Sequence, residues 1–154
     1  MSGGMSPDAT PPDGAPAGRV LAVDYGERRI GLALSDPTRM IASPAGFILR
    51  RPGKRPPVAE LIRHAESAEA TAIVLGLPLD GNGDETPRCA EVREIGAALA
   101  ERTGLPVRYV DERFTTAAAL RAVREMGGST AGRKGDVDAM AATVLLQHAL
   151  RMPE

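Results

Sequence analysis

A carboxylate ends the first apolar segment of this chain. The stretch VLAVDYGERRIGLALSD, residues 20–36, runs through four apolar residues to Asp24 and then turns back into a second segment. Burying a charged carboxylate costs several kcal/mol unless a cation or hydrogen-bond donors pair with it. The fold must therefore bring a partner for Asp24 to the end of this strand.

The two segments around this aspartate predict an antiparallel hairpin. Residues 19–24 form a short apolar strand, and residues 30–36 alternate with the two-residue period of a half-buried strand. Between them lies the sequence YGERR, in which Gly26 can adopt a positive φ. A weaker third strand is expected over residues 40–50, where Pro44 indicates a sheet edge or a bend.

The middle of the chain alternates predicted helices with a predicted strand. Apolar residues at helical spacing predict a helix over residues 58–70, and a β-branched apolar run over residues 71–78 predicts a buried strand. Thr86 at an N-cap position and Pro87 at the first helical position predict a second helix, which runs to Gly104.

Four further elements complete the expected order. They are a strand over residues 105–113, a helix over residues 115–126, a loop over residues 127–135 and an apolar closing helix over residues 136–150. An antiparallel start followed by alternating βα units predicts an α/β fold. We expect a mixed five-stranded sheet, three antiparallel strands and then parallel ones, flanked by helices.

Composition favours one soluble domain, which we place at residues 19–151. The first 18 residues are rich in Pro, Gly, Ala and Asp and lack the basic start and apolar core of a signal peptide, so we expect a disordered tail. Hydrophobic residues make up 43% and charged residues 25%, as in ordinary globular proteins. The single cysteine, Cys89, cannot form an internal disulfide, which agrees with a cytoplasmic location.

The charge balance limits what the whole chain can attract. A net charge of −1 and a pI of about 6.2 give no global attraction to nucleic acid or to an anionic membrane. No apolar run approaches the roughly 20 residues that a membrane span requires. Aromatic residues make up only 3% of the chain, so we expect any nucleic-acid recognition to depend on backbone and shape rather than on base stacking.

Acidic residues stand at the ends of three predicted elements. Asp24 ends the first strand, the sequence VDER ends the last strand, and GDVD opens the closing helix. Because ligands gather at the carboxyl ends of parallel strands, these acids are candidates for one site. Converging carboxylates repel one another, and a divalent cation reverses that balance. Carboxylate oxygens are the ligands that Mg²⁺ and Mn²⁺ prefer, and two such ions can promote phosphodiester hydrolysis.

Residue spacing does not decide which of Asp111 and Glu112 serves the site, but it favours different roles for Asp136 and Asp138. Asp111 and Glu112 are neighbours on a predicted strand and point to opposite faces, so only one of them is expected to serve the site. Asp136 and Asp138 are two residues apart on a helix and likewise have different roles. We interpret Asp136 as the N-cap and Asp138 as the inward-pointing group.

Four ordered motifs carry a resemblance to a known family. The sequences DYGERRIGLALSD, VLGLPLDGNGDET, VDERFTT and KGDVDAMAA resemble the YqgF (RuvX) family, which is described as pre-16S rRNA nucleases and Holliday junction resolvases. The resemblance covers about residues 19–150. It implies a ribonuclease H-like fold and a metal-dependent endonuclease that holds Mg²⁺ or Mn²⁺. The acidic positions of the family fall on Asp24, Glu112 and Asp138, which would be both catalytic and metal-binding.

Three other residues are candidates for contact with substrate. Gly26 would let the backbone approach a phosphate, although a hairpin turn explains it equally well. Arg113 could contact a substrate phosphate or only orient Asp111. Lys134, in a predicted glycine-flanked loop, is a flexible cation that could follow a nucleic-acid backbone.

Two other functions compete with the nuclease interpretation. The sequence DYGERRIG also resembles the phosphate-binding hairpin of actin-like phosphotransferases, but those enzymes use two such domains and this chain has room for one. A binding protein for ribosome precursors or DNA, without catalysis, is the other alternative. Three acids facing phosphate would weaken such a binder, which favours the nuclease. We expect a monomer or a homodimer, with precursor rRNA or a four-way DNA junction as the partner.

Overall fold

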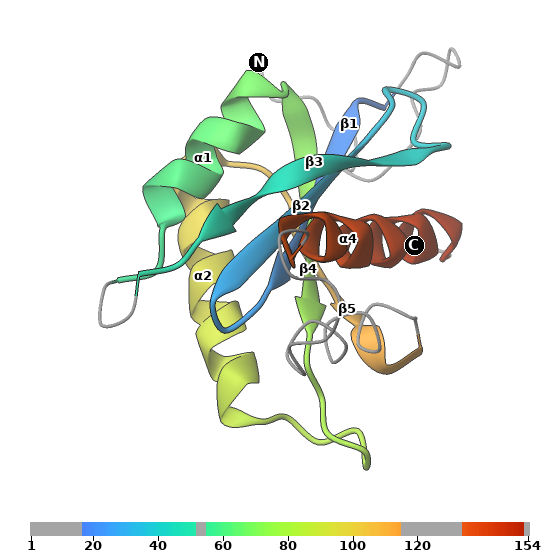
Figure 1. Cartoon of the computed structure of the whole chain (residues 1–154). Coiled ribbons are helices and arrows are strands. Elements are labelled where there is room, and N and C mark those ends of the chain that lie inside the picture. The colour runs from blue at the N-terminus through green and yellow to red at the C-terminus, as the bar shows by residue number, and fades with distance from the viewer. Residues whose placement is uncertain (1–16, 52–54, 115–133, 153–154) are drawn as a thin grey trace.

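One mixed sheet of five strands, in the order β3-β2-β1-β4-β5, organises the computed structural model (Figure 1). The structure describes residues 17–51, 55–114 and 134–152. The strands are β1 (Arg19–Tyr25), β2 (Arg29–Ser35), β3 (Ala42–Leu49), β4 (Ala70–Leu77) and β5 (Val107–Asp111). β1, β2 and β3 pair antiparallel, whereas β4 pairs parallel with both β1 and β5. The predicted mixed sheet is therefore confirmed.

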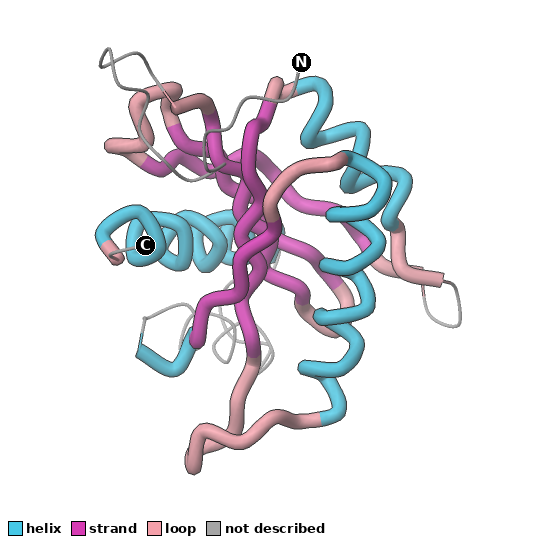
Figure 2. Tube along the Cα trace, turned by 180° about the vertical axis from the view of Figure 1, so that it is seen from behind, coloured by secondary structure: helices cyan, strands magenta, loops and turns pink. Residues whose placement is uncertain are grey.

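The β1–β2 hairpin is confirmed, but two of its expected details are wrong. β2 was expected to be half-buried, yet both of its faces are covered, because helices lie on both sides of the sheet (Figure 2). Its alternate residues Gly31 and Ala33 pack under a helix that the strand pattern alone does not indicate. In the turn, the Gly26 N–H donates to the Arg29 carbonyl at 3.0 Å. Gly26 is not among the described residues with positive φ.

β3 is an edge strand with an irregular register. Ala33 of β2 pairs with Pro44, whereas Gly31 pairs with Phe47, so two residues of β3 oppose the single β2 residue between these pairs. Gly46 in this bulge has a φ of +95°, which a residue without a Cβ adopts without strain. The predicted edge position of Pro44 is confirmed.

Helices cover the two faces of the sheet unequally. α1 (Val58–Ser67) and α2 (Pro87–Thr103) lie together on one face, and α4 (Lys134–Arg151) crosses the other (Figures 1 and 2). The first layer encloses the larger core, built from side chains such as Leu21, Leu75 and Ile95. Under α4 the core is made largely of small residues. It consists of Val20, Ala22, Ala33, Ala72, Val74, Val110, Ala141, Ala142, Leu145, Leu146 and Ala149. None of the helices in the described ranges is long and apolar enough to cross a bilayer.

The ends of α2 follow the sequence signals, with one difference in chemistry. Thr86 is the N-cap, Pro87 is the first helical residue, and Gly104 ends the helix in the left-handed conformation. The Thr86 hydroxyl does not cap the helix; it donates instead to the Pro78 carbonyl at 3.1 Å. This bond ties the start of α2 to the end of β4.

α4 begins earlier than predicted. Its first residue is Lys134, so Lys134 does not lie in a loop and Asp136 is not the N-cap. The three-residue helix η1 (Glu112–Phe114) follows β5, and the predicted helix over 115–126 falls outside the described residues. Residues 1–16 of the predicted tail also fall outside them. Of the last two tail residues, Gly18 donates to the Pro37 carbonyl and Ala17 accepts from Thr71.

The contact between α2 and β5 depends on a glycine and gives a stability prediction. A Cβ at Gly96 would collide with the Tyr109 hydroxyl and lie 2.9 Å from Leu75 Cδ1. Alanine favours a helix over glycine by about 1 kcal/mol, but overpacking costs about 1–3 kcal/mol. We therefore expect Gly96→Ala to lower the free energy of unfolding, measured by urea denaturation.

The matched control is Gly81→Ala, because nothing lies within 4 Å of a Cβ at Gly81. It should leave the free energy of unfolding unchanged within about 0.5 kcal/mol. A Gly96→Ala protein as stable as the parent would contradict the tight contact.

Candidate functional site

Asp24 is buried on the face of the sheet that α4 covers. Its side chain is only 2% exposed. Successive strand residues alternate between faces, and Asp24 shares its face with Ala22, which packs in the core under α4. Its partner across the antiparallel ladder is Gly31. The predicted buried carboxylate at the end of the first strand is therefore present.

Glu112 is a second buried acid and lies in a slot left by a glycine. It is the first residue of η1, directly after β5, and is 2% exposed. A Cβ placed on Gly76 of β4 would be 2.5 Å from Glu112 Oε2 and 3.0 Å from Leu145 Cδ2 of α4. Any larger residue at position 76 would therefore displace the carboxylate or the helix.

The strand register brings these two acids toward the same place. β1 and β4 pair in parallel up to Val23 and Leu75, and the next residues along the two strands are Asp24 and Gly76. Gly76 in turn pairs with Val110 of β5, two residues before Glu112. Asp24 thus enters from one side of Gly76 and Glu112 from the other, both on the α4 face. These are the two buried acids among the described side chains.

The third predicted acid is placed only by its backbone. Position 138 lies in α4, seven residues or about two turns before Leu145, the residue that packs near the Gly76 slot. The side chains of residues 134–138 fall outside the described part of the structure, so the roles of Asp138 and Lys134 stay predictions. Among the described side chains, no three His, Cys, Asp or Glu residues gather at metal-binding distances.

Asp111 and Glu112 have different environments, which bears on the choice that strand spacing left open. The Asp111 carboxylate accepts hydrogen bonds from Arg113, with Nη2 2.8 Å from Oδ2, and its side chain is 24% exposed. These hydrogen bonds hold the pKa of Asp111 below its usual range. Asp111 is therefore committed to a surface ion pair, whereas Glu112 is directed into the protein.

Arg113 joins the end of β5 to the loop after β4. Besides its ion pair with Asp111, its guanidinium lies 3.1 Å from where a Cβ of Gly83 would be, and Nη1 is 3.5 Å from the Gly81 carbonyl. Asp80 holds that loop by accepting from the backbone N–H groups of Asn82 and Asp84. Of the two predicted roles of Arg113, orientation of Asp111 is the one that these contacts support.

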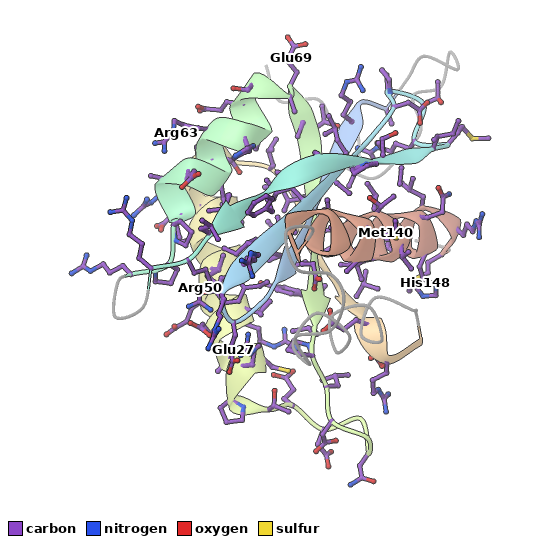
Figure 3. All side chains as sticks on the ribbon, in the orientation of Figure 1. Glu27, Arg50, Arg63, Glu69, Met140 and His148 are labelled. Atoms are coloured by element: carbon purple, nitrogen blue, oxygen red, sulfur yellow. The ribbon has the colours of Figure 1, made fainter. Side chains whose placement is uncertain are left out.

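The Gly26 turn is held by a contact that sequence reasoning missed. Arg50, at the end of β3, donates from Nη1 to the Gly26 carbonyl at 2.9 Å and lies 4.3 Å from the centroid of the Tyr25 ring. It also pairs with Glu91 of α2 at 3.1 Å. Arg50 lies at the hairpin end of the sheet, near Glu27 (Figure 3). Burial raises the pKa of Tyr25 to about 12. The basic run RRPGKR, residues 50–55, is the sequence signal that could have pointed to Arg50.

Comparisons with known proteins agree with this architecture. A family model described as "RuvX: Holliday junction resolvase" matches residues 18–152. A protein of Roseiflexus sp. (strain RS-1) named "Putative pre-16S rRNA nuclease" is 41% identical over 130 residues, which cover 84% of this chain and 92% of that protein. A Rhodopirellula baltica protein of the same name is 43% identical over 141 residues, covering 90% and 80%.

A solved structure supports the fold independently. The structure described as "T. thermophilus RuvC in complex with Holliday junction substrate" superimposes with a TM-score of 0.54 at 16% identity, covering 86% of this chain and 92% of that chain. At this identity the likeness concerns the fold alone. The expected ribonuclease H-like fold is confirmed.

The Asp111–Arg113 pair gives a prediction about pH. Because the folded-state pKa of Asp111 is lowered, its contribution to stability is present above pH about 4 and is lost as the pH falls through the folded-state value. We expect Arg113→Gln to raise the pKa of Asp111 toward the usual range of an aspartate, measured by NMR titration of the side-chain carboxyl carbon.

Arg93→Gln is the matched control, because Arg93 pairs with Glu85 at a separate surface position. It should leave the pKa of Asp111 where it is in the parent protein. An unchanged Asp111 titration in Arg113→Gln would mean that the ion pair does not form in solution.

Proposed function

The chain belongs to the RuvX family, and from this premise we propose that it is an endonuclease that hydrolyses nucleic-acid phosphodiester bonds with carboxylate-bound Mg²⁺ or Mn²⁺ ions. The proposed ligands are Asp24, Glu112 and Asp138. The observation that carries this proposal is the pair of buried acids, Asp24 and Glu112, on the two sides of Gly76.

The donor set fits a hard divalent cation. Two acidic side chains are buried on one face of the sheet, where carboxylates that approach each other repel. The absence of a side chain at Gly76 leaves room for the Glu112 carboxylate against the sheet. Carboxylate oxygens at a buried site are typical of magnesium and manganese centres.

The proposed chemistry divides between the ions and the chain. When bound, two such ions would supply an activated water and stabilisation of the leaving oxygen. The protein chain holds the carboxylate ligands in position. β1 fixes Asp24 within the sheet ladder, the Gly76 slot fixes Glu112, and α4 would bring Asp138 to the same face. Rigid elements hold carboxylates more accurately than loops do, which suits a reaction that depends on alignment.

We further propose that the substrate is precursor 16S rRNA, processed near its 5′ end. The names of the curated relatives support this choice. A four-way DNA junction is the second candidate, and the description of the family model favours it. For a phosphate contact we propose the cation of Lys134. The Gly26 N–H and carbonyl are engaged with Arg29 and Arg50 in the hairpin turn, and Arg113 is engaged with Asp111.

The central test is cleavage by acid variants. We expect Asp24→Asn, Glu112→Gln and Asp138→Asn each to lower the initial cleavage rate at least about 100-fold, because the loss of one carboxylate ligand removes several kcal/mol of transition-state stabilisation. Each variant is assayed with Mg²⁺ or Mn²⁺ on a precursor rRNA fragment and on a four-way DNA junction. Asp111→Asn, next to Glu112 but paired with Arg113, is the control and should keep the rate within a few-fold.

The outcomes separate the candidate functions. Cleavage of only one substrate identifies it. Unchanged cleavage by Asp24→Asn would refute the assignment of the metal site. Binding of either nucleic acid in EDTA, with no cleavage in Mg²⁺ or Mn²⁺, would instead favour a binding protein without catalysis.

Gly76→Ala tests the slot without altering any charge. The added Cβ would meet Glu112 Oε2 at 2.5 Å, so we expect the carboxylate to move and the cleavage rate to fall about 100-fold. Gly96→Ala introduces a comparable collision away from the acids and serves as the control for lost stability. Equal activity of the two variants, measured where both are folded, would count against a role for the slot.

A further inference from the structure

A bulge in β3 turns Phe47 away from the larger core. If the ladder continued regularly from the Ala33–Pro44 pair, Phe47 would lie opposite Ile30, a fully buried residue of the α1–α2 layer. The extra residue in β3 moves Phe47 opposite Gly31 instead. A shift of one residue exchanges the faces of a strand, so Ile48 enters the core and Phe47 points to the α4 face.

This shift puts Phe47 in the same row of the sheet as Asp24. Gly31 pairs with Phe47 on one side and with Asp24 on the other, and it has no side chain to separate them. Phe47 and Asp24 are therefore two strand spacings apart, which corresponds to about 10 Å between their backbones. Phe47 remains 43% exposed although α4 crosses this face of the sheet (Figure 1). An exposed aromatic ring therefore lies two strands from the proposed metal ligand Asp24, on the same face of the sheet.

The neighbouring residues extend this surface away from Asp24. Leu49, two residues on and on the same face, is 61% exposed, and it pairs with Arg29 of β2. We call Phe47, Leu49 and Arg29 the Phe47 surface. Its exposed aromatic ring suits a nucleic-acid strand, whose bases stack on aromatic side chains.

We propose that Phe47 stacks on an unpaired base of the substrate strand, close to the phosphate that is cut. This inference rests on the proposed nuclease function. Stacking on an aromatic ring is tolerant of sequence because every base has a π face. Phe47 would thus hold the strand in place without reading its sequence. This role differs from the sequence-based expectation that recognition depends on backbone and shape alone.

A second copy of the chain is the other occupant to consider for this exposed apolar surface. The position of Phe47 favours a nucleic acid, because Phe47 lies in the same row and on the same face of the sheet as Asp24. Self-association is therefore treated below as an outcome that overturns the proposal.

The experiment measures stacking without requiring cleavage. Single-stranded RNA and DNA oligonucleotides carrying 2-aminopurine, whose fluorescence is quenched by stacking, are titrated with the parent protein and its variants in EDTA. We expect Phe47→Ala to weaken binding about 5- to 150-fold and to abolish the quenching, because one base–aromatic stack contributes about 1–3 kcal/mol. Phe47→Trp should retain both signals. Phe47→Leu should behave like Phe47→Ala, since it keeps an apolar side chain and lacks a ring.

Ile41→Ala is the matched control. Ile41 is also apolar and is 63% exposed, but it lies at the other end of β3. It should bind and quench as the parent does. A preference of the quenching for the RNA or the DNA oligonucleotide identifies which strand the surface accepts.

Three results would overturn the inference. Phe47→Ala could bind like the parent, Phe47→Leu could restore binding, or sedimentation could show a parent dimer that Phe47→Ala dissociates. Each of these leaves cleavage by the parent protein intact. Failure of the proposed function is distinct, because the parent protein itself would then cut neither substrate.

Discussion

Two buried acids on one face of the sheet are the main constraint on how the α4 layer packs. Asp24 on β1 and Glu112 after β5 approach from the two sides of β4, and only a glycine at position 76 of β4 leaves space between the sheet and α4 for the Glu112 carboxylate. A purely hydrophobic layer would be more stable at this position, because each buried carboxylate loses its hydration. The fold thus sacrifices stability where its chemistry is proposed to occur, as functional sites commonly do.

The two helical layers differ in the size of the side chains that they pack against the sheet. The α1–α2 layer packs large side chains such as Leu75 and Ile95 and supplies most of the apolar core. The α4 layer uses Ala141 and Ala142 against Ala22 and Ala33, so the helix can lie close to the sheet that carries the acids. Met140 on the same helix is 54% exposed (Figure 3). One layer therefore mainly stabilises the domain, and the other encloses the site.

The sequence predicts the elements well because their signals are local. The apolar run before Asp24 and the Thr86-Pro87 start of α2 depend on residues close together in the chain, and both elements are present. Glu112 was singled out through the family resemblance, and its burial agrees with that choice. The role of Asp138 stays a prediction, because its side chain lies outside the described residues.

The sequence-based predictions are wrong or incomplete where contacts between segments far apart in the sequence determine the structure. The sequence predicts a half-buried β2 because its alternate residues, Gly31 and Ala33, are small. In the structure these residues are covered by α4, which lies more than 100 residues later in the sequence. The Thr86 hydroxyl bonds to Pro78 because β4 ends beside it. The orientation of Phe47 depends on one extra residue in β3, which no periodicity count detects. The contact of Arg50 with Tyr25 likewise forms only when β3 lies beside the hairpin.

The irregularity of β3 has a second consequence, for the solubility of the protein. An edge strand exposes unpaired backbone groups on which another chain can build, and a flat apolar edge promotes aggregation. In β3, Pro44 has no N–H to offer and the bulge at Gly46 interrupts the flat edge. The strand can therefore display Phe47 and Leu49 to solvent while remaining a poor template for an incoming strand. The bulge that turns the Phe47 side chain to the face of Asp24 and Glu112 therefore also hinders the addition of a further strand at this edge.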